Sequence, residues 1–264
     1  MTLFFILGNI AFNILYYFVF QNPWFIPLNL ILSLLSTTLI LLIIIIIVAQ
    51  FFPLGKPTSK LKYRYIQSGM KFFFRLMRVK PEVINKENIP THNNFALFPN
   101  HKSYCDIMAM LYATDKPISA VGKKEVYKVP VLRKYMKGLN VIALDRDNDR
   151  KALEQILQAV KNLKNGLPML IFPEGGRRNK DVDEMVDIKA GAYKLATKNK
   201  ADIVPVALIN FINIKHNVFK RKTPVKIIYC KPLTYDDYKE MSTQEIGEYV
   251  FNTVNNTIKE FKNK

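Results

Sequence analysis

The pattern of hydrophobic positions begins with two long apolar segments. Residues 3–20 form the first, interrupted only by one glycine and two asparagines, and residues 24–52 form the second. At about 1.5 Å per residue, 18 residues span about 27 Å, close to the ~30 Å hydrocarbon core of a bilayer. Buried core helices would give the same pattern, but two adjacent segments without a charged side chain favour a transmembrane hairpin. Residues 21–24, which contain a proline and a tryptophan, are predicted to form its turn.

A basic segment with interspersed apolar residues follows the hairpin. We predict that residues 59–79 form a helix that lies against anionic lipid. A solvated helix packed on the rest of the protein has the same periodicity, so that alternative stays open. The basic residues are Lys56, Lys60, Lys62, Arg64, Lys71, Arg75, Arg78 and Lys80, and the large apolar ones are Leu61, Ile66, Met70, Phe72, Phe73, Phe74, Leu76 and Met77.

From residue 83 onward, short apolar runs alternate with helical stretches. This alternation predicts an α/β domain with a largely parallel sheet. The predicted strands are Phe95–Phe98, Ile118–Val121, Val141–Leu144, Met169–Phe172, Ile203–Leu208 and Val225–Tyr229, and the predicted helices cover 104–113, 150–165, 189–199 and 243–262. We therefore divide the chain into a hairpin (1–55), a basic interfacial helix (56–80) and an α/β domain (81–264).

Charge is unevenly distributed along the 264 residues. Lysines and arginines number 39 against 21 acidic residues, a net charge of +18, and no charged side chain precedes Lys56. Such a basic region suits a polyanion, either nucleic acid or an anionic membrane surface. Beside a transmembrane hairpin we expect anionic membrane lipid and no nucleic acid. Because basic residues follow the second apolar segment directly, we expect an integral protein of the cell membrane with its α/β domain in the cytoplasm.

Cysteine and histidine are sparse. Cys105 and Cys230 give no disulfide framework, and His92, His101 and His216 are too scattered to indicate a zinc site. We therefore expect no metal and a reduced, cytosol-facing domain.

A histidine and an aspartate follow the apolar run that ends at Pro99. A carboxylate beside an imidazole fixes its tautomer and stabilises the imidazolium, so His101 and Asp106 are candidates for a general base and its partner. On one continuous helix these residues would point about 140° apart, but they can meet if the helix begins between them with Ser103 as N-cap. Alternatively, Asp106 serves only the helix terminus in a capping box, and His101 is an ordinary loop residue.

Two further apolar runs end in residues suited to phosphate. The run 138–144 leads to Arg146, and the run that begins at residue 169 leads to Glu174 and two arginines around a pair of glycines. Glycines let backbone N–H groups approach a ligand closely. Since ligands of such folds bind beyond the carboxyl ends of strands, we expect His101, Arg146 and Glu174 to gather there.

The order of these motifs resembles the glycerolipid acyltransferase family, in particular the 1-acyl-sn-glycerol-3-phosphate acyltransferases. The resemblance covers roughly residues 80–235. The family's blocks N-H-x-x-x-x-D, D-R, F-P-E-G-T-R-S and V-P-V are similar to Asn100–Asp106, Asp145–Arg146, Phe172–Arg178 and Val204–Val206. Gly176 stands where the family usually has threonine, and Arg178 where it often has serine.

The resemblance implies transfer of a fatty acyl group to the sn-2 hydroxyl of lysophosphatidic acid, which gives phosphatidic acid. The donor would be a thioester of acyl carrier protein or coenzyme A, with no other cofactor. His101 would take the proton of the attacking hydroxyl and Asp106 would orient His101. Arg146 and Arg177 would hold the phosphate, because a planar guanidinium can bind two oxygens.

The same resemblance places Glu174 and Gly175 in the substrate site. Glu174 would either accept a hydrogen bond from the glycerol backbone or hold an arginine in place, and the sequence leaves both roles open. Because the substrate supplies the hydroxyl, no attacking side chain is needed. We therefore interpret Cys105 as a packing residue and Ser103 as a helix cap.

Other functions remain compatible with the sequence. A sister acyltransferase would act on another lysolipid or on glycerol 3-phosphate. A membrane-bound lipid hydrolase would use the same base with water as the acceptor. A non-catalytic basic module would bind a polyanion and would tolerate the loss of His101 and Asp106.

Overall fold

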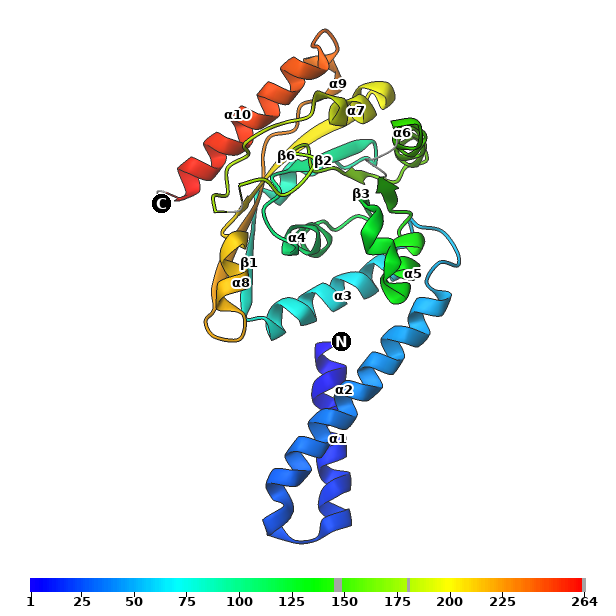
Figure 1. Cartoon of the computed structure of the whole chain (residues 1–264), viewed down its shortest axis with the longest axis vertical. Coiled ribbons are helices and arrows are strands. Elements are labelled where there is room, and N and C mark those ends of the chain that lie inside the picture. The colour runs from blue at the N-terminus through cyan, green and yellow to red at the C-terminus, as the bar shows by residue number, and fades with distance from the viewer. Residues whose placement is uncertain (145–148, 180, 263–264) are drawn as a thin grey trace.

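The computed structural model describes residues 1–144, 149–179 and 181–262. A helical hairpin extends from one side of an α/β domain (Figure 1). Its arms are helices α1 (Thr2–Phe20) and α2 (Ile26–Phe51), and the 3-10 helix η1 (Pro23–Phe25) lies at the turn. By length and composition alone both arms are able to cross a membrane, with mean hydropathies of 1.9 and 3.1. Both predicted helices and the turn are confirmed.

Polar side chains on the two arms pair with each other. The Asn13 amide donates to the Ser33 hydroxyl at 2.8 Å, and the Tyr16 and Ser36 hydroxyls lie 2.7 Å apart. Polar groups inside a bilayer need partners within the protein, since lipid tails offer none. The polar residues that interrupt the apolar segments therefore hold the hairpin together.

Helix α3 (Lys60–Leu76) lies between the hairpin and the rest of the domain (Figure 1). It confirms the predicted basic helix but ends three residues earlier, because a strand begins directly after it. Tyr63 and Phe74 are buried, whereas Leu61 and Leu76 are 79% and 52% exposed. One face therefore packs on the domain while another presents apolar side chains outward, and lipid contact of that face stays a prediction.

The described residues form a seven-stranded sheet in the order β1-β7-β6-β2-β5-β3-β4. Neighbouring strands are parallel except for the antiparallel pair β6–β7. This arrangement confirms the predicted α/β fold with a largely parallel sheet. The strands are β1 (Val79–Ile84), β2 (Phe95–Pro99), β3 (Ser119–Lys123), β4 (Ile142–Leu144), β5 (Met169–Leu170), β6 (Asp202–Ile209) and β7 (Thr223–Tyr229).

Strand β1 was not predicted, because Lys80, Pro81 and Glu82 interrupt its apolar pattern. Among the described strands it lies at one edge of the sheet and pairs with β7 alone. An edge strand tolerates proline and charge because one side needs no ladder hydrogen bonds. Strand β5 is shorter than predicted, because its ladder ends at Leu170.

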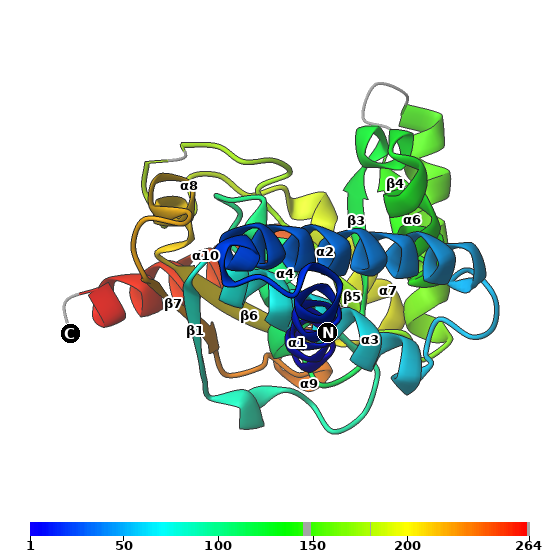
Figure 2. The same ribbon diagram turned by 90° about the horizontal axis from the view of Figure 1, so that it is seen from below.

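Helices cover both faces of the sheet (Figures 1 and 2). Side chains of α3 and α4 belong to one apolar core, and those of α6, α7 and α10 to the core on the opposite face. The four helices predicted for the domain are confirmed as α4 (Cys105–Ala113), α6 (Asp149–Lys164), η4 (Ala190–Tyr193) with α7 (Lys194–Asn199), and α10 (Thr243–Lys262). The remaining helical segments are η2 (Lys86–Asn88), η3 (Lys124–Lys128), α5 (Pro130–Gly138), η5 (Phe211–Asn213), α8 (Ile214–Asn217) and α9 (Tyr235–Tyr238).

Candidate active site

The loop between β2 and α4 brings His101 and Asp106 together. Nδ1 of His101 donates to Oδ2 of Asp106 at 2.9 Å. Helix α4 begins at Cys105, so the helix start separates the two residues as predicted. With its proton on Nδ1, the neutral ring has its free lone pair on Nε2. The histidine side chain is 21% exposed and the aspartate side chain 1%, so the base faces outward and its partner is enclosed.

Asp106 also shapes the loop that carries the histidine. Its Oδ2 accepts the backbone N–H groups of Lys102 and Ser103, each at 2.7 Å. The predicted cap is wrong by one residue, because the N-cap of α4 is Tyr104. The Ser103 hydroxyl nevertheless accepts the N–H of Cys105 at 3.1 Å, in the first turn. Asp106 therefore serves the helix start and the imidazole together, and the two interpretations from sequence are compatible.

An aromatic ring supports the imidazole from the neighbouring strand. Phe172 lies two residues after the end of β5, and its ring stacks on His101 with centroids 3.9 Å apart and planes 23° apart. The hydrogen bond to Asp106 and this stacking together fix both the tautomer and the plane of the ring. A fixed ring is what a general base needs to meet a hydroxyl in a defined direction.

Glu174 is completely buried and binds the same loop. Its Oε1 accepts the backbone N–H of His101 at 2.7 Å, and its Oε2 accepts the Lys102 ammonium at 2.6 Å. The Lys102 side chain is only 2% exposed and also donates to the carbonyl of Arg178 at 3.0 Å. The sequence left two roles open for Glu174, contact with the glycerol backbone or support of an arginine. The geometry is closer to the second role, but the cation that Glu174 binds is Lys102 and not an arginine.

Of the two arginines predicted to bind phosphate, the structure describes Arg177 but not Arg146. The Arg177 guanidinium carbon lies 3.3 Å from the centroid of the Tyr104 ring. Tyr104 is the N-cap of α4, three residues after His101, and is 78% exposed, so Arg177 lies at the open surface beside the start of α4. Arg146, together with Asp145, lies outside the described residues. Its place in the site stays a prediction.

The glycine at position 175 is required by the turn. Its φ is +66°, and a Cβ there would lie 2.8 Å from Cε of Lys189. A side chain would be strained in that backbone conformation, so glycine lets Glu174 and Arg177 follow one another closely around the turn. Arg178, which departs from the family pattern, is exposed and pairs with Asp187 at 2.8 Å. This arginine points to a surface partner and not to His101.

Cys105, the first residue of α4, is buried in the apolar core. Burial is the main cause that raises the pKa of its thiol, so it stays protonated and poorly nucleophilic at neutral pH. This supports the interpretation of Cys105 as a packing residue.

Sequence reasoning missed Lys102, Tyr104 and Phe172 as members of the site. A lysine or a tyrosine in a loop is usually solvated, so neither residue type by itself indicates burial or a place in the site. The position of Lys102 beside His101 was the one available signal, because a neighbour of a catalytic residue is often drawn into its support.

Comparisons with known proteins agree with this arrangement. The family model described as Acyltransferase matches residues 80–209. The 1-acyl-sn-glycerol-3-phosphate acyltransferase of Bacillus subtilis is 29% identical over 203 residues, which are 76% of this chain and 98% of that protein. The enzyme of the same name from Borreliella burgdorferi is 30% identical over 176 residues, which are 66% of this chain and 69% of that protein.

The fold comparison points to the same proteins. The crystal structure of the 1-acyl-sn-glycerophosphate acyltransferase PlsC from Thermotoga maritima matches with a TM-score of 0.66 and 25% identity. The match covers 76% of this chain and 80% of that one. Taken together with the His101–Asp106 pair at the carboxyl end of β2, these similarities show that the chain belongs to the acyltransferase family that includes the 1-acyl-sn-glycerol-3-phosphate acyltransferases.

Proposed function

We propose that this acyltransferase moves a fatty acyl group from a thioester to the sn-2 hydroxyl of 1-acyl-sn-glycerol 3-phosphate and so makes phosphatidic acid. The observation that carries the proposal is the 2.9 Å contact between Nδ1 of His101 and Oδ2 of Asp106, in a chain of this family. The donor is acyl carrier protein or coenzyme A in thioester linkage, and it acts as a co-substrate.

The chemistry follows from the placement of His101. An alcohol is a poor nucleophile at neutral pH, so Nε2 takes its proton as the oxygen attacks the thioester carbonyl. The carbon–sulfur bond then breaks, the thiolate leaves, and the proton on Nε2 passes to that sulfur. Asp106 stabilises the imidazolium between these two steps without itself taking the proton. The new ester stays on the lipid, and no acyl-enzyme intermediate forms.

Arg177 supports the choice of a phosphate monoester as acceptor. It lies at the open surface beside the start of α4, and a monoester carries nearly two negative charges at pH 7. Arg146, which follows β4 in the chain, is proposed as the second ligand. Glu174 is proposed to act through the loop of His101 and Lys102, because its side chain is 0% exposed and both of its oxygens accept hydrogen bonds from that loop.

Membrane attachment suits a reaction whose acceptor and product are lipids. We propose that α1 and α2 cross the cell membrane and that the α/β domain lies on its cytoplasmic face. The basic residues of α3 would then meet the anionic lipid of that leaflet.

The direct test is an assay of the full chain in lipid vesicles. The acceptors are a panel of lysolipids and glycerol 3-phosphate, and the donors are acyl thioesters of acyl carrier protein and of coenzyme A. The products are identified by mass. We expect phosphatidic acid from lysophosphatidic acid, and a loss of about 10²–10⁴-fold in turnover for His101→Ala. The assignment of the base is wrong if His101→Ala stays within a few-fold of the parent.

The same assay separates the alternatives. A preference for lysophosphatidylcholine or glycerol 3-phosphate would identify a sister acyltransferase. Release of free fatty acid without a new ester would identify a hydrolase.

A further inference from the structure

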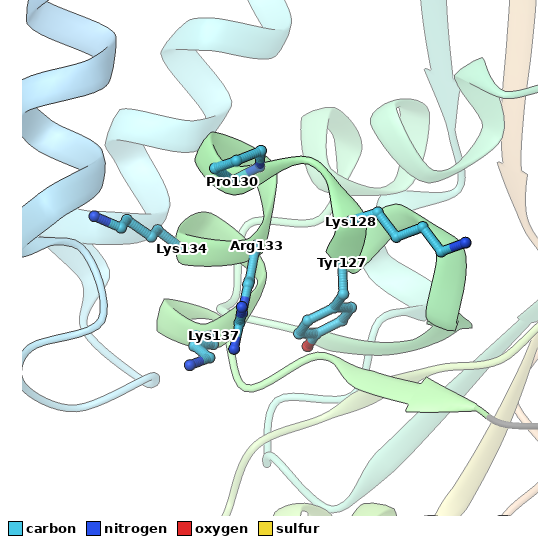
Figure 3. A pocket seen from close by; sticks show the side chains of 6 residues that line it. All are labelled: Tyr127, Lys128, Pro130, Arg133, Lys134 and Lys137. Carbon is cyan, nitrogen blue, oxygen red and sulfur yellow. The ribbon is translucent and has the colours of Figure 1, made fainter.

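Segments η3 and α5 present an unusual combination of exposed side chains. Val126, Val129 and Leu132 are 40%, 48% and 46% exposed. Beside them a shallow pocket is lined by Tyr127, Lys128, Pro130, Arg133, Lys134 and Lys137 (Figure 3). We call the three apolar residues and this pocket the η3–α5 surface. Among the described residues, no ion pair joins Lys128, Arg133 or Lys137 to an acidic group, although η3 also carries the exposed Glu125. Cations therefore outnumber acidic side chains on this surface.

Contacts with α2 fix the height of this surface along the hairpin. The Tyr135 hydroxyl donates to the backbone carbonyl of Ile45 at 2.7 Å. Ile45 belongs to the apolar run of the second arm and lies six residues before the last helical residue, Phe51. At about 1.5 Å per residue, that contact is about 9 Å inside the end of the helix. Helix α2 has 26 residues, or about 39 Å, and so exceeds the ~30 Å hydrocarbon core by about 9 Å. If α2 crosses the bilayer from its first residue, the Ile45 contact lies at the boundary of that core, and α5 lies at the depth of the lipid headgroups.

Further contacts make this attachment rigid. The ring centroids of Phe52 and Tyr135 lie 4.7 Å apart. The hydroxyl oxygens of Tyr135 and of Tyr65, on α3, lie 3.1 Å apart. Lys134 contacts the Gln50 side chain, and Figure 3 shows it pointing toward the hairpin while Arg133 and Lys137 point into the pocket. A Cβ on Gly138 would overlap the ring and backbone of Phe52. Helix α5 is thus held against the junction of α2 and α3.

From these observations we propose that the η3–α5 surface rests on the bilayer and that its pocket binds the phosphate groups of anionic phospholipid headgroups. Valine and leucine side chains suit the boundary between acyl chains and headgroups, and the lysines and arginine suit the phosphates beside it. An acidic carrier protein would match the same charges. The depth set by Ile45 favours lipid, because a protein that docks from water would have to displace headgroups there. The inference goes beyond acyl transfer and does not depend on the identity of the acceptor.

The first experiment measures where the surface lies. Val129→Cys is labelled with an environment-sensitive fluorophore in the full chain, reconstituted in vesicles of phosphatidylcholine with phosphatidylglycerol. Cys105 and Cys230 are buried and remain as they are. The matched control is a label at Lys194→Cys, on α7 at the end of the domain away from the hairpin (Figure 1). We expect nitroxide-labelled phospholipid to quench only the Val129 label and aqueous iodide to quench mainly the Lys194 label.

The second experiment tests the charges. Two double variants are made in the protein labelled at Val129→Cys. Arg133→Glu/Lys137→Glu reverses two charges of the pocket, and the control Lys194→Glu/Lys198→Glu reverses two charges on α7, so the net charge changes equally. We expect the phosphatidylglycerol content needed for half-maximal quenching to rise roughly tenfold or more for the first pair and to stay unchanged for the second. Inorganic phosphate added to pure phosphatidylcholine vesicles serves as the probe for a free-phosphate site, and we expect it to have no effect.

Three results would overturn the proposal. One is iodide quenching of the Val129 label that is as strong in vesicles as in detergent. Another is a response to inorganic phosphate that equals the response to phosphatidylglycerol. The third is protection of the Val129 label by added acyl carrier protein without quenching by lipid. None of these readouts requires turnover, so the failure of this proposal is distinguishable from the failure of the proposed acyl transfer.

Discussion

Lys102 and Glu174 form a buried ion pair that joins the loop after β2 to the loop after β5. Removing one partner leaves an uncompensated charge inside the protein, at a cost of ~3–5 kcal/mol. We expect Lys102→Met and Glu174→Gln each to lower the stability to denaturant and to reduce kcat, because His101 loses its support. Lys102→Met/Glu174→Gln should regain part of the stability, since no lone charge remains, and a double-mutant cycle on both quantities measures this coupling.

The matched control for that cycle is the pair Arg178–Asp187, whose side chains are 54% and 47% exposed. Asp187→Asn should cost no more than ~1 kcal/mol, because water screens an exposed pair. A different outcome would contradict the positioning role of Glu174. If Glu174→Gln raised KM for the acceptor and left kcat and stability intact, its carboxylate would contact the substrate.

Asp106 holds the imidazole and two backbone N–H groups with a single oxygen. In Asp106→Asn an amide replaces the carboxylate, so the charge that stabilises the imidazolium is lost. We expect kcat to fall by about 10²–10⁴-fold with little change in KM, because the interaction is strongest in the transition state. Steady-state kinetics check this, and circular dichroism checks that the helix start survives. A variant with nearly normal kcat would mean that Asp106 serves only the helix terminus.

Arg177 rests on the ring of Tyr104 and is free to meet a phosphate at the open surface. A charge-assisted hydrogen bond is worth ~1.5–3 kcal/mol, so Arg177→Ala should raise KM for lysophosphatidic acid roughly 10–150-fold and KM for the donor much less. Tyr104→Ala should show a smaller version of the arginine effect, because Arg177 loses the ring on which it rests. An unchanged KM for lysophosphatidic acid in Arg177→Ala would place the phosphate elsewhere.

At the scale of elements, the position of α5 depends on a glycine. A Cβ on Gly138 would lie 2.5 Å from the carbonyl oxygen of Phe52, which is backbone and cannot move aside cheaply. Gly138→Ala should therefore destabilise the protein by ~1–3 kcal/mol and loosen α5 from α2. Gly191→Ala is the control, because nothing lies within 4 Å of its added Cβ. Thermal unfolding in detergent compares the two, and equal Tm values would show that α5 is not tightly held.

The elements also show which parts of the fold a sequence can predict. Strands β2 and β6 have nearly continuous apolar runs and were predicted within two residues, because a strand buried on both faces needs such a run. Strand β7 was predicted equally well from its apolar second half, although Lys226 interrupts its pattern. The edge strand β1 was missed because polar residues interrupt its pattern, and α5 was missed because its nine residues are shorter than the window of about 11–18 residues in which helical periodicity is recognised. The His101–Asp106 contact was predicted because it depends on a local helix start. The Lys102–Glu174 pair joins residues 72 positions apart, and only the packing of two loops reveals it.

At the scale of the whole molecule, the hairpin and the charge distribution together predict the topology. The Met1 amine donates to the Ser68 hydroxyl of α3 at 2.8 Å, so the start of α1 lies beside the domain, while η1 is at the far end of the hairpin (Figure 1). Helix α1 has 19 residues, or about 28 Å at ~1.5 Å each, which is long enough to span the hydrocarbon core. If the hairpin crosses the membrane, the basic residues of α3 lie at the membrane face that carries the domain, and the positive-inside rule predicts that this face is cytoplasmic.

We therefore expect both ends of the chain in the cytoplasm and only the turn around Trp24 outside. A tag after Lys264 should be protected from protease in intact cells and should become accessible when the membrane is opened. A single cysteine placed at Trp24, which is 88% exposed, should react with a membrane-impermeant reagent from outside, because Cys105 and Cys230 are buried and give little background. As a control, cysteine at the exposed Lys194 should react only after permeabilisation. An accessible C-terminal tag together with an unreactive Trp24→Cys would reverse the topology. If neither Trp24→Cys nor Lys194→Cys reacts in intact cells, the hairpin enters the membrane without crossing it.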